Sequence, residues 1–323
     1  MVLNFPQTRF FLFISLLIST TVFGTTPKEN VDQYVKENYP KRFSTIEKFA
    51  NRVKTDFKTK EEQARAIYCW MAYNISYDVK GLNEQKVFKY SYNNEAQKLA
   101  IEKQIFKEIA EDALKDKSAI CDGYSKLYKA VCDELGIECE IVEGFSRVYL
   151  SDLTRKFQNP DHAWNAIKID DKWFLVDVTW GAGYLDQSMK FVWEYEPLYF
   201  KGSPEVFFRN HYPSDKKWLF MDKTLTDFTN QPLYYLTSIT KETEVLAPLT
   251  SFINQKEPIE ILIKTKLEEK NFNYAFDTEP YLQNFKMKYQ NDHLSLLVSP
   301  PKRKSKYLTI YYNGSGIITY KCK

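Results

Sequence analysis

Apolar residues at helical spacing dominate the first part of the chain. Ser44 and Thr59 each stand three residues before a glutamate, the capping-box spacing that marks a helix start. The segment after Thr59 predicts a helix that buries one stripe and ends near residues 74–78. The residues of that stripe are Ala64, Ile67, Tyr68, Met71 and Ile75. Residues 83–117 are polar and weakly periodic, so we expect a loop with one surface helix there.

The stretch SAICDGYSKLYKAVCDELG, residues 118–136, predicts a second amphipathic helix. Gly136 suits the left-handed position that follows a helix, and Ser118 is the expected N-cap. Cys121 therefore falls in the first helical turn. The buried face, read at i, i+3, i+4, i+7 and i+11, consists of Tyr124, Leu127, Tyr128, Val131 and Leu135.

The stretch DHAWNAIKIDDKWFLVDVTWGAGY, residues 161–184, predicts a tight β-hairpin, because alternating runs flank Asp170 and Asp171. If the residues on either side of this turn pair with each other, His162 pairs with Thr179. His162 and Asp177 then lie on one face of the sheet as diagonal neighbours. A slip of one residue would place them on opposite faces.

From about Thr240 the helical periodicity gives way to short β-like runs separated by turn residues. This pattern predicts a small, Ig-like all-β sandwich domain over residues 240–323. The aromatic, Pro-containing segment 191–240 is expected to pack against the first domain. The predicted organisation is a signal peptide at 1–24, a core with its C-terminal extension at 25–239, and the β-sandwich.

The signal-peptide prediction rests on Arg9, the apolar run of residues 10–23 and the small residue Gly24. An uncleaved N-terminal anchor is the alternative. The run is short for a membrane span, and no later segment has about 18 consecutive apolar residues, so we expect no transmembrane span in the mature chain. The protein is then exported, to the periplasm, the cell surface or the medium.

Composition excludes two classes of partner. The 323 residues contain 45 Lys and Arg against 42 Asp and Glu, so neither a nucleic-acid footprint nor a polybasic membrane patch is indicated.

Five cysteines are too few for a disulfide framework, and their odd number leaves at least one thiol free. All except Cys121 are expected to be structural: Cys69, Cys132, Cys139 and Cys322, with pairing left open. The oligomeric state is equally open.

Cys121, His162 and Asp177 together suggest nucleophilic catalysis. A helix N-terminus and a nearby imidazolium can lower a cysteine pKa from about 8.5 to roughly 3.5–7.5, and a carboxylate can orient the imidazole. The backbone N–H of Cys121 is one candidate oxyanion donor, and Tyr77 and Asn74 are candidates for the second. Each residue also has a plain structural interpretation: a packed thiol, a satisfied histidine, and a carboxylate bonded to backbone.

Three segments resemble the transglutaminase-like superfamily, in particular the branch that includes kyphoscoliosis peptidase: ARAIYCWMAYNISYD, AICDGYSKLYKAVCDELGIECEIVEGF and the hairpin stretch. The resemblance runs from about Phe43 to Met221. It implies a papain-like α+β core in which a Cys-bearing helix packs on an antiparallel sheet, with Cys121, His162 and Asp177 as the catalytic triad. His211 lies in a similar downstream extension and is interpreted as structural, since the triad already has its base.

The resemblance implies an enzyme that acts on a protein or peptide substrate through an acyl-enzyme, and we expect a peptidase or amidase. A protein-crosslinking transglutaminase is one alternative, because the two reactions differ only in the acceptor. A non-catalytic surface binding or scaffold protein is another. No metal-ligand motif and no Gly-rich phosphate loop stands in the sequence, so we expect neither a metal nor another cofactor.

Overall fold

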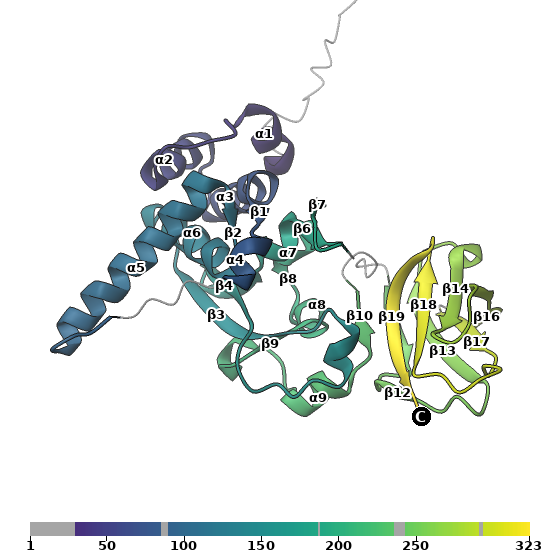
Figure 1. The fold of residues 1–323 in the computed structure, drawn as a ribbon. Helices are drawn as coiled ribbons and strands as arrows, with labels where there is room; N and C mark the ends of the chain where they lie inside the picture. Colours follow the sequence, from purple (N-terminus) through teal and green to yellow (C-terminus); the bar gives the residue numbers. More distant parts are fainter. Residues whose placement is uncertain (1–29, 85–89, 187, 236–242, 291–292) are drawn as a thin grey trace, which may run out of the picture.

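The computed structural model describes residues 30–323 except 85–89, 187, 236–242 and 291–292. The predicted signal peptide and the predicted boundary at residue 239 lie outside the described residues. The chain forms a mixed helix-and-sheet core and, beside it, an all-β part (Figure 1). This is the α+β class with antiparallel sheets that the sequence predicts. None of the helices in the described part of the chain is both long and apolar enough to cross a membrane.

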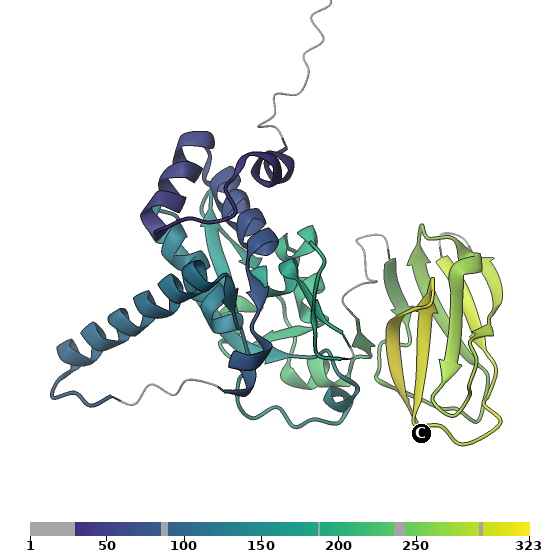
Figure 2. The ribbon, with the colours of Figure 1, turned by 45° about the horizontal axis from the view of Figure 1, so that its top comes forward.

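Helix α3 (Lys60–Asn74) is buried on nearly every side, and the helices that come before it in the chain pack against it. Its N-cap Thr59 and Glu62 form the predicted capping box. The other predicted start is displaced by one residue: Thr45, not Ser44, caps α2 by accepting from the Lys48 N–H. The remaining helices before residue 117 are α1 (Val31–Asn38), α2 (Ile46–Asp56), α4 (Val79–Asn83) and α5 (Glu95–Asp116), and the first half of α5 projects from the core (Figure 2).

Helix α6 (Cys121–Glu134) begins at the cysteine itself. The prediction that Ser118 caps this helix is wrong. The N-cap is Ile120, whose side chain makes no capping hydrogen bond. The reason is that residues 118–119 form strand β2 and pair in parallel with β1 (Ser76–Tyr77). Gly136 has φ +63°, as expected for a left-handed residue after a helix.

The core sheet has the strand order β8-β5-β4-β3-β9 and carries α6 on one face. Its strands are β3 (Cys139–Ser146), β4 (His162–Ile169), β5 (Lys172–Val176), β8 (Phe200–Gly202) and β9 (His211–Pro213). The β4–β5 hairpin has the predicted register, with Ile169 opposite Lys172. The pairing stops at Asn165 opposite Val176, so the extension to Thr179 is wrong: Asp177 already caps helix α7 (Val178–Ala182).

Short elements connect this sheet to the C-terminal part. They are η1 (Leu150–Leu153), β6 (Gly183–Leu185), β7 (Phe191–Trp193), η2 (Pro197–Tyr199), α8 (Pro204–Phe208), η3 (Lys216–Trp218) and α9 (Leu225–Asn230). Segment 191–235 packs on the core, as its aromatic content suggested, because Phe200, Phe207 and Trp218 join the main buried cluster.

The C-terminal part consists of two sheets around a second apolar cluster. One has the order β10-β19-β18-β14-β15, with β12 added to β19, and the other β11-β13-β17-β16. The bounds are β10 (Leu233–Tyr234), β11 (Thr243–Ala247), β12 (Phe252–Ile253), β13 (Ile259–Thr265), η5 (Glu269–Asn271), β14 (Phe272–Phe276), β15 (Gln283–Asn284), β16 (Lys286–Gln290), β17 (His293–Val298), β18 (Tyr307–Tyr312) and β19 (Ser315–Cys322). Strand β10 follows the core along the chain but pairs with the last strand.

Candidate active site

Cys121 stands at the start of α6 with a partly exposed side chain. The first intrahelical hydrogen bond of α6 is the one that the Tyr124 N–H donates to the Ile120 carbonyl at 3.1 Å. The N–H groups of residues 121–123 precede this bond and form the positive end of the helix. A negative charge that develops on or beside the sulfur is therefore stabilised there.

His162, on β4, lies between Cys121 and Asp177. Its Nε2 is 2.6 Å from Asp177 Oδ2, so Nδ1 is the ring nitrogen left for the thiol. Burial alone would lower the pKa of His162, but the charge and hydrogen bond of Asp177, with a smaller contribution from the Cys121 thiol, raise it to about 10. The ring is consequently an imidazolium at neutral pH.

Asp177 is fully buried at the end of the hairpin, where it caps α7. Its Oδ1 accepts from the Trp180 N–H at 3.0 Å. Burial would raise its pKa, but the charge and hydrogen bond of His162, with the hydrogen bond of His211, hold the pKa well below the usual range. Asp177 is therefore a carboxylate that balances the His162 charge.

His211 is the residue that sequence reasoning placed outside the site. It lies on β9, where it pairs with Ser146 of β3, and its Nε2 is 2.9 Å from the same oxygen of Asp177. Burial keeps the pKa of His211 below the usual value in spite of the carboxylate, so a neutral ring donates Nε2–H. The one feature of the sequence that could have pointed to a role for His211 in the site is that the chain has three histidines.

Two indoles enclose this cluster. The centre of the His162 ring lies 5.4 Å from that of Trp180 and 5.8 Å from that of Trp164, and Trp180 also contacts His211 at 4.2 Å. Such apolar walls exclude water and strengthen the charge interactions within. In the described residues His162, Asp177 and His211 are also the group whose donor atoms could surround a metal ion. Their contacts of 2.6 and 2.9 Å are hydrogen bonds, which engage the atoms that an ion would need.

The two candidates for a second oxyanion donor differ in position. Asn74 donates its side-chain N–H to the Trp70 carbonyl at 2.9 Å, so this group is engaged within α3. Tyr77 lines the same cleft as His162. Burial, followed by the proximity of Cys121, raises the pKa of Tyr77, so its hydroxyl keeps its proton and can donate.

All five cysteines are free thiols. Cys69 is buried and contacts Asp32 and Tyr195 at 2.8 and 3.0 Å, and burial raises its pKa. Cys132 and Cys139 are buried where α6 ends and β3 begins. Cys121 is thus the thiol that the fold places beside an imidazole.

Part of the chain is similar to known proteins. Residues 47–178 match the family model of the transglutaminase-like superfamily. The chain is 32% identical to mouse kyphoscoliosis peptidase over 173 residues, which are 52% of this chain and 23% of the mouse protein. It is 30% identical to the human protein over 206 residues, 62% of this chain and 28% of that protein. The chain thus spans about a quarter of the length of these relatives.

Among solved structures the chain is similar to that of a TGase. The two are 16% identical, with a TM-score of 0.30, and the match covers 58% of this chain and 40% of the TGase chain.

Proposed function

We propose that this chain, whose residues 47–178 match the transglutaminase-like superfamily, is an exported cysteine enzyme that cleaves peptide or amide bonds through an acyl-enzyme. One observation carries the proposal: the His162 ring is held by Asp177 at 2.6 Å and turned toward a thiol at a helix N-terminus. A packed, structural cysteine would need neither partner.

The roles follow from the positions of the groups. Cys121 attacks the substrate carbonyl as a thiolate, and the neighbouring His162 imidazolium stabilises the negative charge of the attacking sulfur. The backbone N–H of Cys121 and the Tyr77 hydroxyl are the candidate donors to the oxyanion. His162 then gives its proton to the departing amine, which leaves a thioester on Cys121. Asp177 holds the ring in place and balances its charge throughout.

The second half of the reaction decides between two activities. Water that attacks the thioester gives hydrolysis, whereas an amine gives transamidation. We favour hydrolysis, because the more similar curated relatives carry the name peptidase. Crosslinking is then the alternative, and it would appear as incorporation of an added primary amine into the product.

The decisive experiment measures the reactivity of Cys121 without a known substrate. Iodoacetamide labels the folded wild-type protein at neutral pH, and peptide mass spectrometry follows each of the five cysteines. We expect Cys121 to react first and His162→Ala to slow that reaction about tenfold or more, since the variant lacks the imidazolium that stabilises the thiolate. Cys121→Ala, which changes no buried contact of the triad carboxylate, is the control for background labelling.

The same experiment can refute the proposal. If Cys121 reacts no faster than the buried thiols, or if His162→Ala leaves its rate unchanged, the cysteine is a packed thiol. The transglutaminase-like core would then serve as a binding module. A peptide-library digest with wild type and Cys121→Ala separates hydrolysis from both alternatives.

A further inference from the structure

We propose that the C-terminal β domain forms one wall of the substrate cleft, and that this cleft takes an extended peptide with an aromatic or other bulky apolar side chain. The inference rests on the proposed function, because it concerns the substrate of the same site. It assigns a role to a domain that lies outside the matched residues 47–178.

The cleft that contains His162 has a volume of about 760 Å³ and draws its walls from both parts of the chain. The core contributes Tyr77 and Trp180 beside the histidine. The opposite wall belongs to the C-terminal sheet and the segment that leads into it: Tyr235, Thr309, Tyr311 and Gly316. A volume in the range of about 300–1,000 Å³ is typical of ligand sites, and sites commonly form where two domains meet.

Backbone pairing fixes the position of the second wall. Strand β10 leaves the core and pairs with β19, with Leu233 opposite Thr319 and Tyr234 opposite Ile318. The Asn210 side chain donates to the carbonyls of Arg147 and Tyr234, both at 2.8 Å. Because Asn210 directly precedes His211, one side chain connects the active-site cluster to the domain junction.

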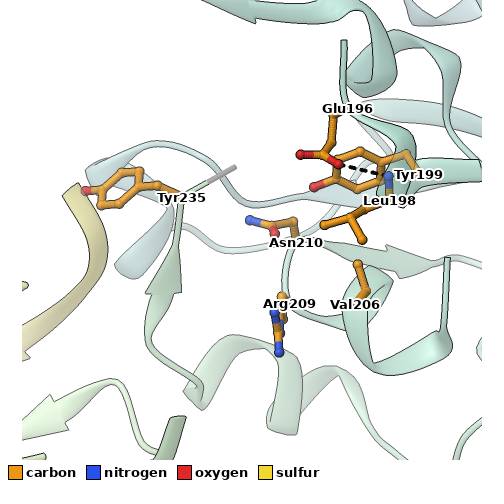
Figure 3. A pocket seen from close by; sticks show the side chains of 7 residues that line it. All are labelled: Glu196, Leu198, Tyr199, Val206, Arg209, Asn210 and Tyr235. Atoms are coloured by element: carbon orange, nitrogen blue, oxygen red, sulfur yellow. Dashed lines mark hydrogen bonds between the residues drawn. The ribbon is translucent and has the colours of Figure 1, made fainter. Parts of the chain in front are cut away.

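Arg147 reinforces this junction from the core side. Its guanidinium is fully buried and donates to the carbonyls of Phe228 and Gln231 at 2.7 and 3.1 Å. These bonds fasten the segment that leads into β10. A small pocket lies next to the junction, and Figure 3 shows Tyr235 on one side of it and Leu198 and Tyr199 on the other, with Asn210 between them.

The charged groups that line the cleft besides His162 have partners within the chain. Arg155 bonds Asp161 at 2.5 Å and Asp152 at 3.3 Å. Asp186 accepts from Ser188 and from the Lys190 N–H within its own turn. Apart from His162, the three carboxylates Asp152, Asp161 and Asp186 outnumber Arg155, which disfavours an acidic side chain on the ligand.

The aromatic side chains of the cleft are the remaining groups that a ligand can contact. The cleft is lined by Tyr77, Tyr149, Trp180, Tyr184, Phe191, Tyr235 and Tyr311. Tyr311 stands opposite Gly316 on β19, which has no side chain to lie beside its ring, and opposite Asn273 on β14. Aromatic surfaces of this kind bury apolar side chains and favour neighbouring rings. Tyr311 is therefore the residue that we assign to selectivity.

The test compares two peptide-based electrophiles with iodoacetamide. Blocked Phe-Ala and Glu-Ala fluoromethyl ketones react with Cys121 through the same warhead but present an aromatic or an acidic side chain to the cleft. We expect wild type to react faster with the Phe compound. Tyr311→Ala should slow that reaction about two- to tenfold, the effect of losing one aromatic contact, without changing the iodoacetamide rate.

Two further variants complete the design. Tyr289→Ala removes an exposed tyrosine from the other sheet of the same domain and should change neither rate. Gly316→Leu fills the cleft instead of emptying it: a Cβ at Gly316 meets Thr309 and Tyr235 only at 3.5 Å, so the backbone accepts it. Gly316→Leu should slow the reaction of Cys121 with both ketones but leave its reaction with iodoacetamide unchanged. This variant tests the inference if Tyr311→Ala does not fold.

Each outcome decides something. Equal ketone rates for wild type, Tyr311→Ala and Gly316→Leu would overturn the inference while leaving the nucleophile in place. A faster reaction with the Glu compound would overturn the assigned side-chain class. If iodoacetamide also fails to label Cys121, the proposed function falls, and the inference falls with it.

Discussion

Replacement of His211 by phenylalanine tests whether the second histidine acts on the catalytic group or only fills space. The change keeps a buried ring among Trp180, Trp164 and Phe207 but removes the N–H that Asp177 accepts at 2.9 Å. Asp177 then keeps two donors of three, His162 and the Trp180 N–H. The carboxylate form becomes less stable, and its pKa rises.

The size of the effect follows from the bond that is lost. A hydrogen bond to a charged group contributes about 1.5–3 kcal/mol, and about 1.4 kcal/mol corresponds to one pH unit. A group with a depressed pKa loses its contribution as the pH falls through its folded-state value. Raising the pKa of Asp177 therefore moves the acid limb of the reactivity profile upward, by about one to two pH units.

The assay is the rate of Cys121 alkylation by iodoacetamide as a function of pH. His211→Gln is the matched control, because its amide can still donate to Asp177 and should keep the acid limb near that of wild type. Thermal melting of all three proteins separates a packing defect from a change in proton affinity. Superimposable profiles for wild type and His211→Phe would refute the reasoning and leave His211 with a packing role.

Three more predictions follow from the geometry. Asp177→Asn should reduce Cys121 alkylation at neutral pH about tenfold or more, since an amide cannot balance the His162 charge; an unchanged rate would remove Asp177 from the triad. Gly144→Ala should destabilise the core by about 1–3 kcal/mol in urea unfolding, because the added Cβ would overlap the Tyr212 carbonyl and the Trp164 ring; full stability would show that β3 and β9 can separate. Expression in a secreting host should give a mature protein that begins after Gly24, read by intact mass, and an uncut chain would favour the anchor.

The central part of the site could be predicted because local rules govern it. Asp170 and Asp171 both have positive φ, the conformation that a two-residue hairpin requires, so the turn fixes the register of β4 against β5. That register brings His162 and Asp177 together, even though pairing ends before Asp177. The helix that begins at Cys121 could be predicted equally well, since the spacing of its apolar residues defines its buried face and Gly136 defines its end.

The parts that could not be predicted depend on long-range pairing. His211 reaches Asp177 only because β9 adds to the far side of β3, and a strand of three residues carries no periodicity. The second wall of the cleft depends on β10 pairing with β19, which follows it by more than 80 positions. Ser118 failed as a cap for a related reason, because β1 competes for its backbone.

Strand β10 also limits how a gene for this protein can be rearranged. Leu233 and Tyr234 are encoded with the core, yet both side chains are buried and their backbone completes the C-terminal sheet. A fragment joined or cut just after them would leave β19 with an open edge, and open edges invite aggregation. Asn210 would lose its Tyr234 acceptor at the same time. Any exchange of the β domain between genes must therefore carry β10 along, so the unit that folds as this sheet begins before residue 240.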